Sequence, residues 1–210
     1  MTTVTKTRNW EDALNELKAG NKRFTSGLKS INSLATYEKL PELAEKGQRP
    51  FAIILSCSDS RVPAEILFDQ GAGDLFMVRV AGNTVAPSLL ASMEFAATNF
   101  QTPLILVMGH TKCGAVDAAI KITNEKIAPS TLGKNLGDLL ERITPAVKRV
   151  SNMKNHQDFS NLCTHENVKH SIETILDQSQ TIFDLVQQDK VKIVGAVFDI
   201  KTGQVEFHQD

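Results

Sequence analysis

The sequence predicts an α/β fold with a mostly parallel central sheet flanked by helices, an N-terminal helical arm and a C-terminal antiparallel edge strand. Four short apolar runs recur along the chain, helical segments separate them, and a glycine-containing turn precedes the last β-rich segment. Continuous apolar runs are typical of strands that are buried on both faces of a parallel sheet. Strands that alternate with helices indicate an α/β domain.

The N-terminal arm is expected over about residues 1–35. Within it, residues 10–25 carry large apolar side chains at helical spacing, which predicts an amphipathic helix that ends near Gly20 or a little later. These side chains are Trp10, Leu14, Leu17 and Phe24. They could cover either the chain's own core or a second subunit, and periodicity does not distinguish the two. Residues 36–47 predict another helix, limited or offset by Pro41.

The remaining elements follow in order. The predicted buried strands are 51–56, 75–80, 104–108 and 191–198. Five helices are predicted between these strands. The first begins at Pro63, the second runs from Pro87 to about Phe100, and the third runs from Gly114 to about Ile122. The last two cover 134–150 and 166–188. A turn at Thr202-Gly203 predicts a last antiparallel strand that ends at Phe207. No repeat or linker divides the 210 residues, so we expect one domain over 1–210.

The bulk composition excludes several classes of protein. Hydrophobic residues make up 41% and charged residues 22%, with a formal net charge of -1. This balance gives no reason to expect a nucleic-acid partner or an anionic membrane surface. No apolar run approaches the ~20 residues that cross a bilayer, and the first ten residues carry no apolar secretory segment. We therefore expect a cytoplasmic protein with no membrane partner.

Two short segments carry the chemistry. Cys57 directly follows the first predicted strand, and His110 and Cys113 directly follow the third. Sites in open α/β sheets gather beyond the carboxyl ends of the strands, so these three side chains are expected in one cleft. Two thiolates and one imidazole suit Zn²⁺, and three protein ligands leave the open fourth position of a catalytic zinc site.

Each of these residues also has a simpler interpretation. A single cysteine at a strand end is usually a small buried apolar residue, and Asp59 with Arg61 would ordinarily be a solvated ion pair. Their coincidence at matching strand ends favours a metal site. In it Asp59 could either complete the zinc shell or hydrogen-bond a zinc-bound water, and Arg61 would orient the carboxylate. The third cysteine, Cys163, is expected to be a buried structural thiol in a loop before the 166–188 helix.

The two segments resemble a known family. CSDSRVPAE at 57–65 and GHTKCGA at 109–115 are similar to the paired signature of β-class carbonic anhydrases. The resemblance extends to GNKRF at 20–24, RVAGN at 79–83 and VGAVFD at 194–199, and it covers roughly residues 10–207. Two separated motifs in the right order are far more specific than either one alone.

The resemblance implies an activity and a set of site residues. It implies one zinc ion per chain, bound by Cys57, His110 and Cys113, and reversible hydration of carbon dioxide to bicarbonate. Zinc-bound hydroxide would attack the substrate, oriented by the catalytic dyad Asp59 and Arg61. The residues that it implies for substrate binding are Gln48, Phe76, Ala81, Phe95 and Gly114. It also implies a homodimer or homotetramer.

Two positions depart from the family's patterns. Ile54 stands where some bacterial members have a tryptophan that helps to form an inhibitory bicarbonate pocket, so we expect no such inhibition and a readily populated open form. Phe95 stands where plant-type members have a tyrosine, which removes a polar group from the substrate pocket.

Three alternatives remain. The same scaffold could hydrolyse COS or CS2, which an assay of CS2 conversion against CO2 hydration would distinguish. A non-catalytic zinc-binding or thiol-sensing protein would not need Asp59 or Arg61. A nucleotide-binding domain is disfavoured because no glycine-rich phosphate loop follows any predicted strand.

Overall fold

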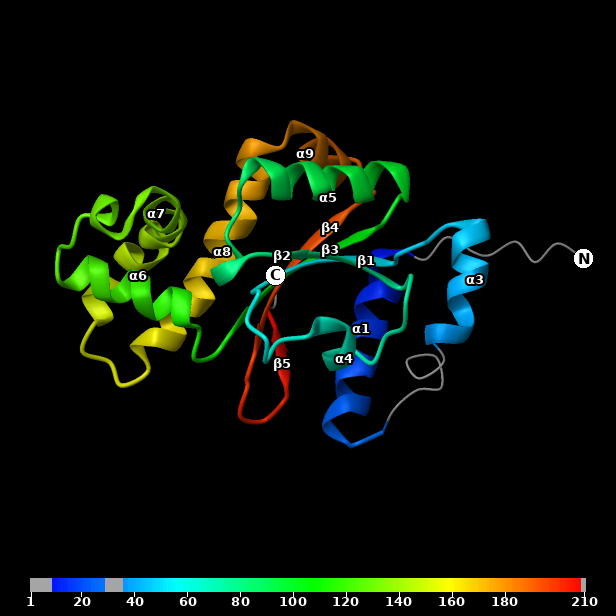
Figure 1. Ribbon diagram of the computed structural model, residues 1–210, viewed down its shortest axis with the longest axis horizontal. Helices are drawn as coiled ribbons and strands as arrows, with labels where there is room; N and C mark the ends of the chain where they lie inside the picture. The colour runs from blue at the N-terminus through cyan, green and yellow to red at the C-terminus, as the bar shows by residue number, and fades with distance from the viewer. Residues whose placement is uncertain (1–8, 29–35, 209–210) are drawn as a thin grey trace, which may run out of the picture.

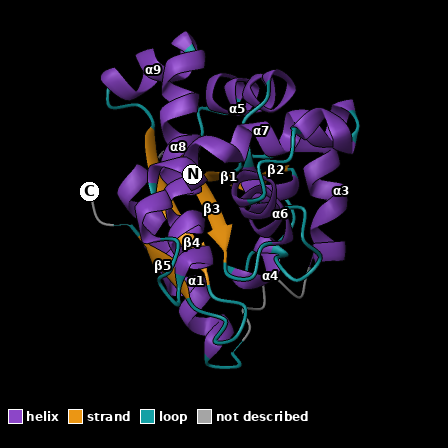
Figure 2. Ribbon diagram, turned by 90° about the vertical axis from the view of Figure 1, so that its left-hand side faces the viewer, coloured by secondary structure: helices purple, strands orange, loops and turns teal. Residues whose placement is uncertain are grey.

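A five-stranded sheet organises the chain in the computed structural model, which describes residues 9–28 and 36–208. Its strands lie in the order β2-β1-β3-β4-β5. Their bounds are β1 Ala52–Ser56, β2 Leu75–Arg79, β3 Leu104–His110, β4 Lys192–Phe198 and β5 Val205–Phe207. All neighbouring pairs are parallel except β4 and β5, which are antiparallel (Figures 1 and 2). The predicted sheet, including its antiparallel edge strand, is confirmed.

The strands bury both faces, as their continuous apolar runs predict. Successive side chains of β1 alternate, so that Ile54 packs in one cluster with α1 (Trp10–Thr25) and α4 (Ala64–Leu67). Ile53 and Leu55 pack in the opposite cluster with α5 (Pro87–Asn99), α8 (Phe159–Gln178) and α9 (Gln180–Gln187). Figure 1 shows these two layers, with α5 and α9 on one side of the sheet and α1 and α4 on the other.

A third cluster lies beyond the carboxyl ends of the parallel strands. It joins α6 (Gly114–Asn124), α7 (Lys134–Arg149) and the first half of α8, and it contains the side chains of Cys57 and Cys113. Figure 1 shows α6 and α7 at this end, away from α3 (Thr36–Lys46). Three short 3-10 turns complete the described elements: η1 Ala81–Asn83, η2 Pro129–Leu132 and η3 Ser151–Met153.

The helix α1 packs against the sheet of its own chain. Leu17 is fully buried in the cluster that contains Ile54, and Trp10, Leu14 and Phe24 are partly buried against it. The side-chain amide of Asn21 donates to the carbonyl oxygens of Leu67 and Gly203 and accepts from the N–H of Val205. The apolar stripe therefore covers the chain's own core. The predicted arm also includes residues 1–8 and 29–35, which lie outside the described residues.

The boundaries differ from the sequence prediction at two helices. Pro63 is the N-cap of α4 rather than its first residue, because its ψ of 95° is extended. The single helix predicted over 166–188 is instead two helices that begin earlier, with a break at Ser179, whose backbone is extended and whose hydroxyl caps α9. Cys163 consequently lies inside α8, fully buried, and the prediction that it lies in a loop is wrong.

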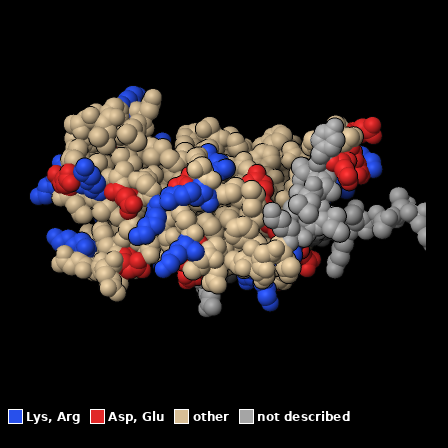
Figure 3. Space-filling view, turned by 60° about the horizontal axis from the view of Figure 1, so that its bottom comes forward, with Lys and Arg blue, Asp and Glu red and all other residues tan. Residues whose placement is uncertain are grey.

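The surface carries both signs of charge. On the face shown in Figure 3, Lys and Arg side chains are interspersed with Asp and Glu side chains. This pattern agrees with the net charge of -1. Among residues 9–28 and 36–208, no helix is both long enough and apolar enough to cross a membrane.

Candidate metal centre

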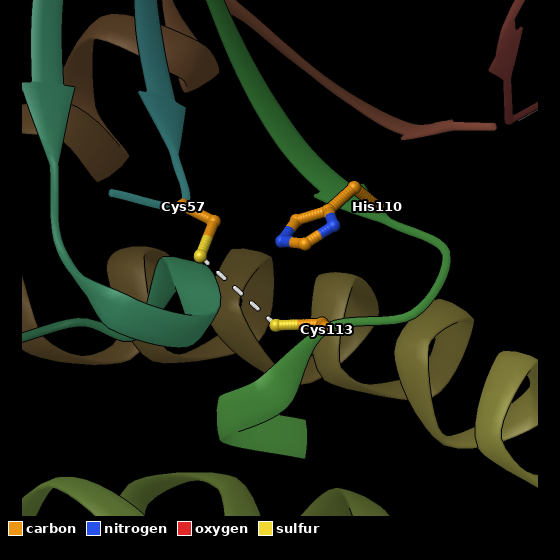
Figure 4. A group of neighbouring side chains, drawn as sticks. All are labelled: Cys57, His110 and Cys113. Atoms are coloured by element: carbon orange, nitrogen blue, oxygen red, sulfur yellow. Dashed lines mark hydrogen bonds between the residues drawn. The ribbon is translucent and has the colours of Figure 1, made fainter. Parts of the chain in front are cut away.

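Cys57, His110 and Cys113 converge at the carboxyl ends of two neighbouring strands. Cys57 follows the last residue of β1, His110 ends β3, and Cys113 precedes the first residue of α6. The two sulfur atoms and a ring nitrogen of His110 all lie within 4.8 Å of one another (Figure 4). The parallel pairing of β1 with β3 brings these segments together although they are more than fifty residues apart.

The spacing of the donor atoms fits a tetrahedral zinc ion. The Sγ atoms of Cys57 and Cys113 are 4.0 Å apart. Two thiolates at the usual Zn–S distance of about 2.3 Å would be separated by ~3.8 Å in a tetrahedral site. Both side chains are buried, so the donors are shielded from bulk water. Among the described residues, no other group of three such side chains is arranged to hold a metal ion.

The imidazole of His110 is oriented for metal binding. Its Nδ1–H donates to the carbonyl oxygen of Thr111 at 3.0 Å, and since a carbonyl can only accept, this bond assigns the proton to Nδ1. Nε2 therefore carries a lone pair, yet it is buried and has no hydrogen-bond partner in the described structure. A buried acceptor left without a partner is costly, and a bound cation would satisfy it.

Cys57 lies where a thiolate is stabilised. Its sulfur accepts hydrogen bonds from the backbone N–H groups of Asp59 at 3.4 Å and Gly82 at 3.3 Å. The neighbouring Cys113 thiol lowers the pKa of Cys57 most, and these two N–H groups lower it further, against the effect of burial. Donors aimed at a buried sulfur favour its anionic, metal-binding form.

Cys113 shares this site with an anionic sulfur. Its hydrogen bond with Cys57 and its burial both raise the pKa of the Cys113 thiol, while the N–H groups of Ala115 and Val116 oppose the rise. These N–H groups belong to the first turn of α6, where the helix dipole also favours negative charge. A divalent cation between the sulfurs would offset their repulsion and allow both to be thiolates.

Asp59 and Arg61 form the predicted pair beside these ligands. The carboxylate accepts two side-chain hydrogen bonds from Arg61, at 2.9 and 2.7 Å, and one from its backbone N–H. These bonds, first those of the Arg61 side chain, hold the pKa of Asp59 well below its usual range. Asp59 Oδ2 lies 3.9 Å from His110 Nε2, so the ionised carboxylate borders the candidate metal position.

Arg61 and Arg79 also form hydrogen bonds to the backbone of the loops that follow β1 and β3. Arg61 Nη2 donates to the carbonyl oxygen of Lys112, a residue in the left-handed conformation between His110 and Cys113. Arg79, at the end of β2, donates to the carbonyl oxygens of Cys57 and Asp59. No role for Arg79 or Gly82 was predicted from the sequence, although both lie in the RVAGN segment that resembles the family.

The predicted substrate-binding residues divide into two groups. Gly114 begins α6 next to Cys113, and Ala81 precedes the glycine whose N–H binds Cys57. Gln48 is exposed before β1, and Phe76 pairs with Ile53 near the start of that strand, at the end of the sheet away from the metal ligands. The structure therefore brings only the first group to the candidate metal centre within one chain.

Phe95 belongs to the second group. Its ring is 51% exposed and lies edge-on to Phe100, with centroids 5.5 Å apart, while Phe76 contacts both rings. These three residues form an aromatic cluster on the sheet face covered by α5. Aromatic side chains are enriched at protein–protein interfaces, and this cluster places one of them, Phe95, half exposed at the surface.

Residues 52–205 match the carbonic anhydrase family. Among curated proteins, the chain is 36% identical over 190 residues to carbonic anhydrase 2 of Mycobacterium tuberculosis, covering 90% of this chain and 87% of that protein. It is 35% identical over 192 residues to the carbonic anhydrase of Mycolicibacterium smegmatis, covering 90% and 89%.

Solved structures give the same result for the fold. The β-carbonic anhydrase CafA of Aspergillus fumigatus superposes with a TM-score of 0.71 at 25% identity, covering 94% of this chain and 91% of that one. A structure from Sordaria macrospora, described as a tetrameric β-carbonic anhydrase, superposes with a TM-score of 0.72 at 24% identity, covering 90% and 98%.

Proposed function

The chain belongs to the β-class carbonic anhydrase family, lyases that hydrate carbon dioxide, and we propose that its site is a zinc centre held by Cys57, His110 and Cys113. The convergence of these three donor atoms within 4.8 Å carries the proposal. When bound there, zinc supplies the Lewis acidity that makes water a nucleophile near neutral pH. We further propose one such site per chain and one catalytic domain over residues 1–210.

Asp59 and Arg61 are proposed as the catalytic dyad. Because the Asp59 carboxylate is ionised and borders the metal position, it can accept a proton or hydrogen bond from a reacting oxygen there. Arg61 binds both carboxylate oxygens, which keeps Asp59 in a fixed orientation and leaves neither oxygen unpaired. This geometry favours the open arrangement, in which a water molecule can enter beside the three ligands.

We propose that the enzyme acts as a homodimer or homotetramer. A related Sordaria macrospora enzyme is described as tetrameric. In this chain Gln48, Phe76 and Phe95 lie away from their own metal ligands, and Phe95 is half exposed. A second copy that packs on the aromatic cluster would bury it and could bring these residues to the other copy's site. Ala81 and Gly114 would complete the substrate pocket from the same chain as the ligands.

Zinc stoichiometry combined with stopped-flow CO2 hydration tests the proposed function. The wild-type protein should retain one zinc per chain and hydrate CO2, whereas Cys113→Ser should lose most of both because serine is a poor zinc ligand. Cys163→Ser is the matched control, since Cys163 is buried outside the ligand set. Wild-type protein that is folded but holds no zinc would contradict the proposal.

The same assay addresses the alternative functions. Faster conversion of CS2 or COS than of CO2 would favour the hydrolase alternative, which uses the same ligands. Zinc binding without any hydration would favour a non-catalytic zinc or thiol protein.

A further inference from the structure

The loop that follows β2 is held by side chains from two distant helices. The carbonyl oxygen of Gly82 accepts from Asn167 Nδ2 at 2.8 Å, and that of Asn83 accepts from Ser171 Oγ at 3.0 Å. The carbonyl oxygen of Val85 accepts from Arg142 Nη1 of α7 at 2.9 Å. Three carbonyl groups within four residues of this loop are therefore bound by side chains that lie far away in the sequence.

The loop needs such support because its backbone is unusual. Gly82 and Asn83 are both in the left-handed conformation, with φ values of 68° and 44°. A Cβ atom at position 82 would lie 2.6 Å from Ile143 Cδ1 of α7, so a larger residue would force that side chain to move. Consecutive left-handed residues are uncommon and persist where neighbouring groups hold them.

The same loop contacts a proposed metal ligand. The N–H of Gly82 donates to the sulfur of Cys57 at 3.3 Å, in a buried environment. The direction of this N–H depends on the conformation of Gly82, whose carbonyl oxygen Asn167 holds. Asn167 of α8 is thus connected to Cys57 through Gly82 alone, by one hydrogen bond on each side of that residue.

Asn167 and Ser171 are well placed to set this geometry. They are four residues apart on α8 and hence on the same helix face, and their exposed fractions are 1% and 2%. α8 also packs on the end of β3, where Val168 Cγ2 would lie 2.9 Å from a Cβ atom at Gly109, next to His110. The same helix therefore contacts the loop whose Gly82 N–H binds Cys57 and the end of the strand that carries His110.

We propose that Asn167 and Ser171 are positioning residues of the metal centre: by holding the carbonyl groups of Gly82 and Asn83, they aim the Gly82 N–H at the sulfur of Cys57. This inference rests on the proposed function, in which Cys57 binds zinc. A hydrogen bond to a ligand atom tunes its charge and orientation, and loss of such an outer contact typically weakens metal binding 10- to 100-fold, as an order of magnitude.

Metal affinity and the cobalt spectrum test the inference without relying on activity. Zinc affinity is measured by competition with a chromophoric chelator for wild type, Asn167→Leu and Ser171→Ala. We expect roughly 10- to 100-fold weaker binding for Asn167→Leu and a smaller loss for Ser171→Ala. In the Co²⁺-substituted protein, the sulfur-to-cobalt absorption band should move to longer wavelength in both variants, because the sulfur loses a hydrogen bond.

Thr164→Val is the matched control. Thr164 is buried on the same helix, but its hydroxyl bonds to the Ser160 carbonyl within α8. It should therefore lose stability without changing the cobalt band or the zinc affinity by more than about twofold. If Asn167→Leu proves too unstable to purify, the milder Ser171→Ala decides the matter with the same two measurements.

Two outcomes separate this inference from the proposed function. Variants with the wild-type cobalt band, and with zinc affinity no weaker than that of Thr164→Val, would overturn the positioning role while leaving the zinc centre intact. Wild-type protein that binds neither zinc nor cobalt would overturn the proposed function and this inference with it.

Discussion

At the scale of single residues, the properties of the site come from hydrogen-bond partners placed around buried sulfur and nitrogen atoms. The carbonyl oxygen of Thr111 directs the Nε2 lone pair of His110 toward the two sulfurs, and backbone N–H groups stabilise the Cys57 thiolate. Arg61 keeps Asp59 ionised beside them. Each of these effects depends on an atom a few ångströms away, so single substitutions should separate metal binding from catalysis.

Asp59→Asn should lower kcat/KM for CO2 hydration by roughly 100-fold or more, since general acid–base groups typically contribute 10²–10⁴-fold. Zinc content should stay at the wild-type level, because the three proposed ligands are unchanged. Stopped-flow hydration and zinc analysis of the same samples check this. Full activity in the variant would favour a site in which Asp59 and Arg61 are dispensable.

At the scale of elements, the hairpin of β4 and β5 connects the edge of the sheet to α1 and α8. The side chain of Asn21, in α1, hydrogen-bonds to the turn before β5 and to the first residue of that strand. His208 lies just after β5, and its Nε2 is 3.0 Å from Nδ1 of His165 in α8. The loop after β3 joins the same region, because the N–H of Thr111 donates to the carbonyl oxygen of Phe198. The stability of this hairpin therefore depends on a few partly buried polar contacts.

Asn21→Ala should lower the free energy of unfolding by about 2–4 kcal/mol, because it removes three hydrogen bonds and leaves backbone groups of Leu67, Gly203 and Val205 without partners. Urea unfolding checks this value. Asn124→Ala, at the exposed end of α6, should change stability by less than about 0.5 kcal/mol. Equal effects of the two substitutions would show that Asn21 does not hold the hairpin.

His208→Asn should reduce the loss of stability at mildly acidic pH. Burial, followed by the nearby His165 and Lys169, lowers the pKa of His208, and Glu206 only partly opposes this. As the pH falls, His208 therefore gains its proton in the unfolded chain before it does so in the folded protein. The stabilisation that neutral His208 gives the folded state is complete above about pH 6.5 and declines as the pH falls below that value.

Urea unfolding at pH 7.5 and pH 5.5 measures this effect. The decrease in unfolding free energy between the two should be smaller in His208→Asn than in wild type, by up to about 1 kcal/mol. His156→Asn, at an exposed position of the turn before α8, should keep the wild-type difference. An unchanged difference in His208→Asn would rule out this histidine as a source of acid sensitivity.

At the scale of the whole molecule, the proposed metal ligands and the partly exposed aromatic cluster lie at opposite ends of the sheet. The carboxyl ends of β1 and β3 carry the proposed zinc ligands, and the aromatic cluster of Phe76, Phe95 and Phe100 lies toward the other end of the strands. A single chain does not bring the two together. We propose that assembly does so, which would link activity to oligomeric state.

Phe95→Asp should shift the protein to a smaller species in sedimentation velocity and lower its kcat/KM, because a charged side chain would be desolvated at the proposed interface. Met153→Asp is the control, since Met153 is 40% exposed in η3, outside the aromatic cluster. A wild-type protein that is monomeric and fully active would contradict the proposed role of assembly.

The α/β architecture, the family and the convergence of Cys57, His110 and Cys113 could all be predicted from the amino-acid sequence. This was possible because apolar runs predict parallel strands, and residues just after such strands meet at one edge of the sheet. The break at Ser179 became visible only in the folded chain, because it depends on a hydroxyl that both caps α9 and binds Glu94. The folded chain also revealed the contact of Asn167 with Gly82, two residues 85 positions apart, because hydrogen bonds at such separation follow from packing and leave no local pattern in the sequence.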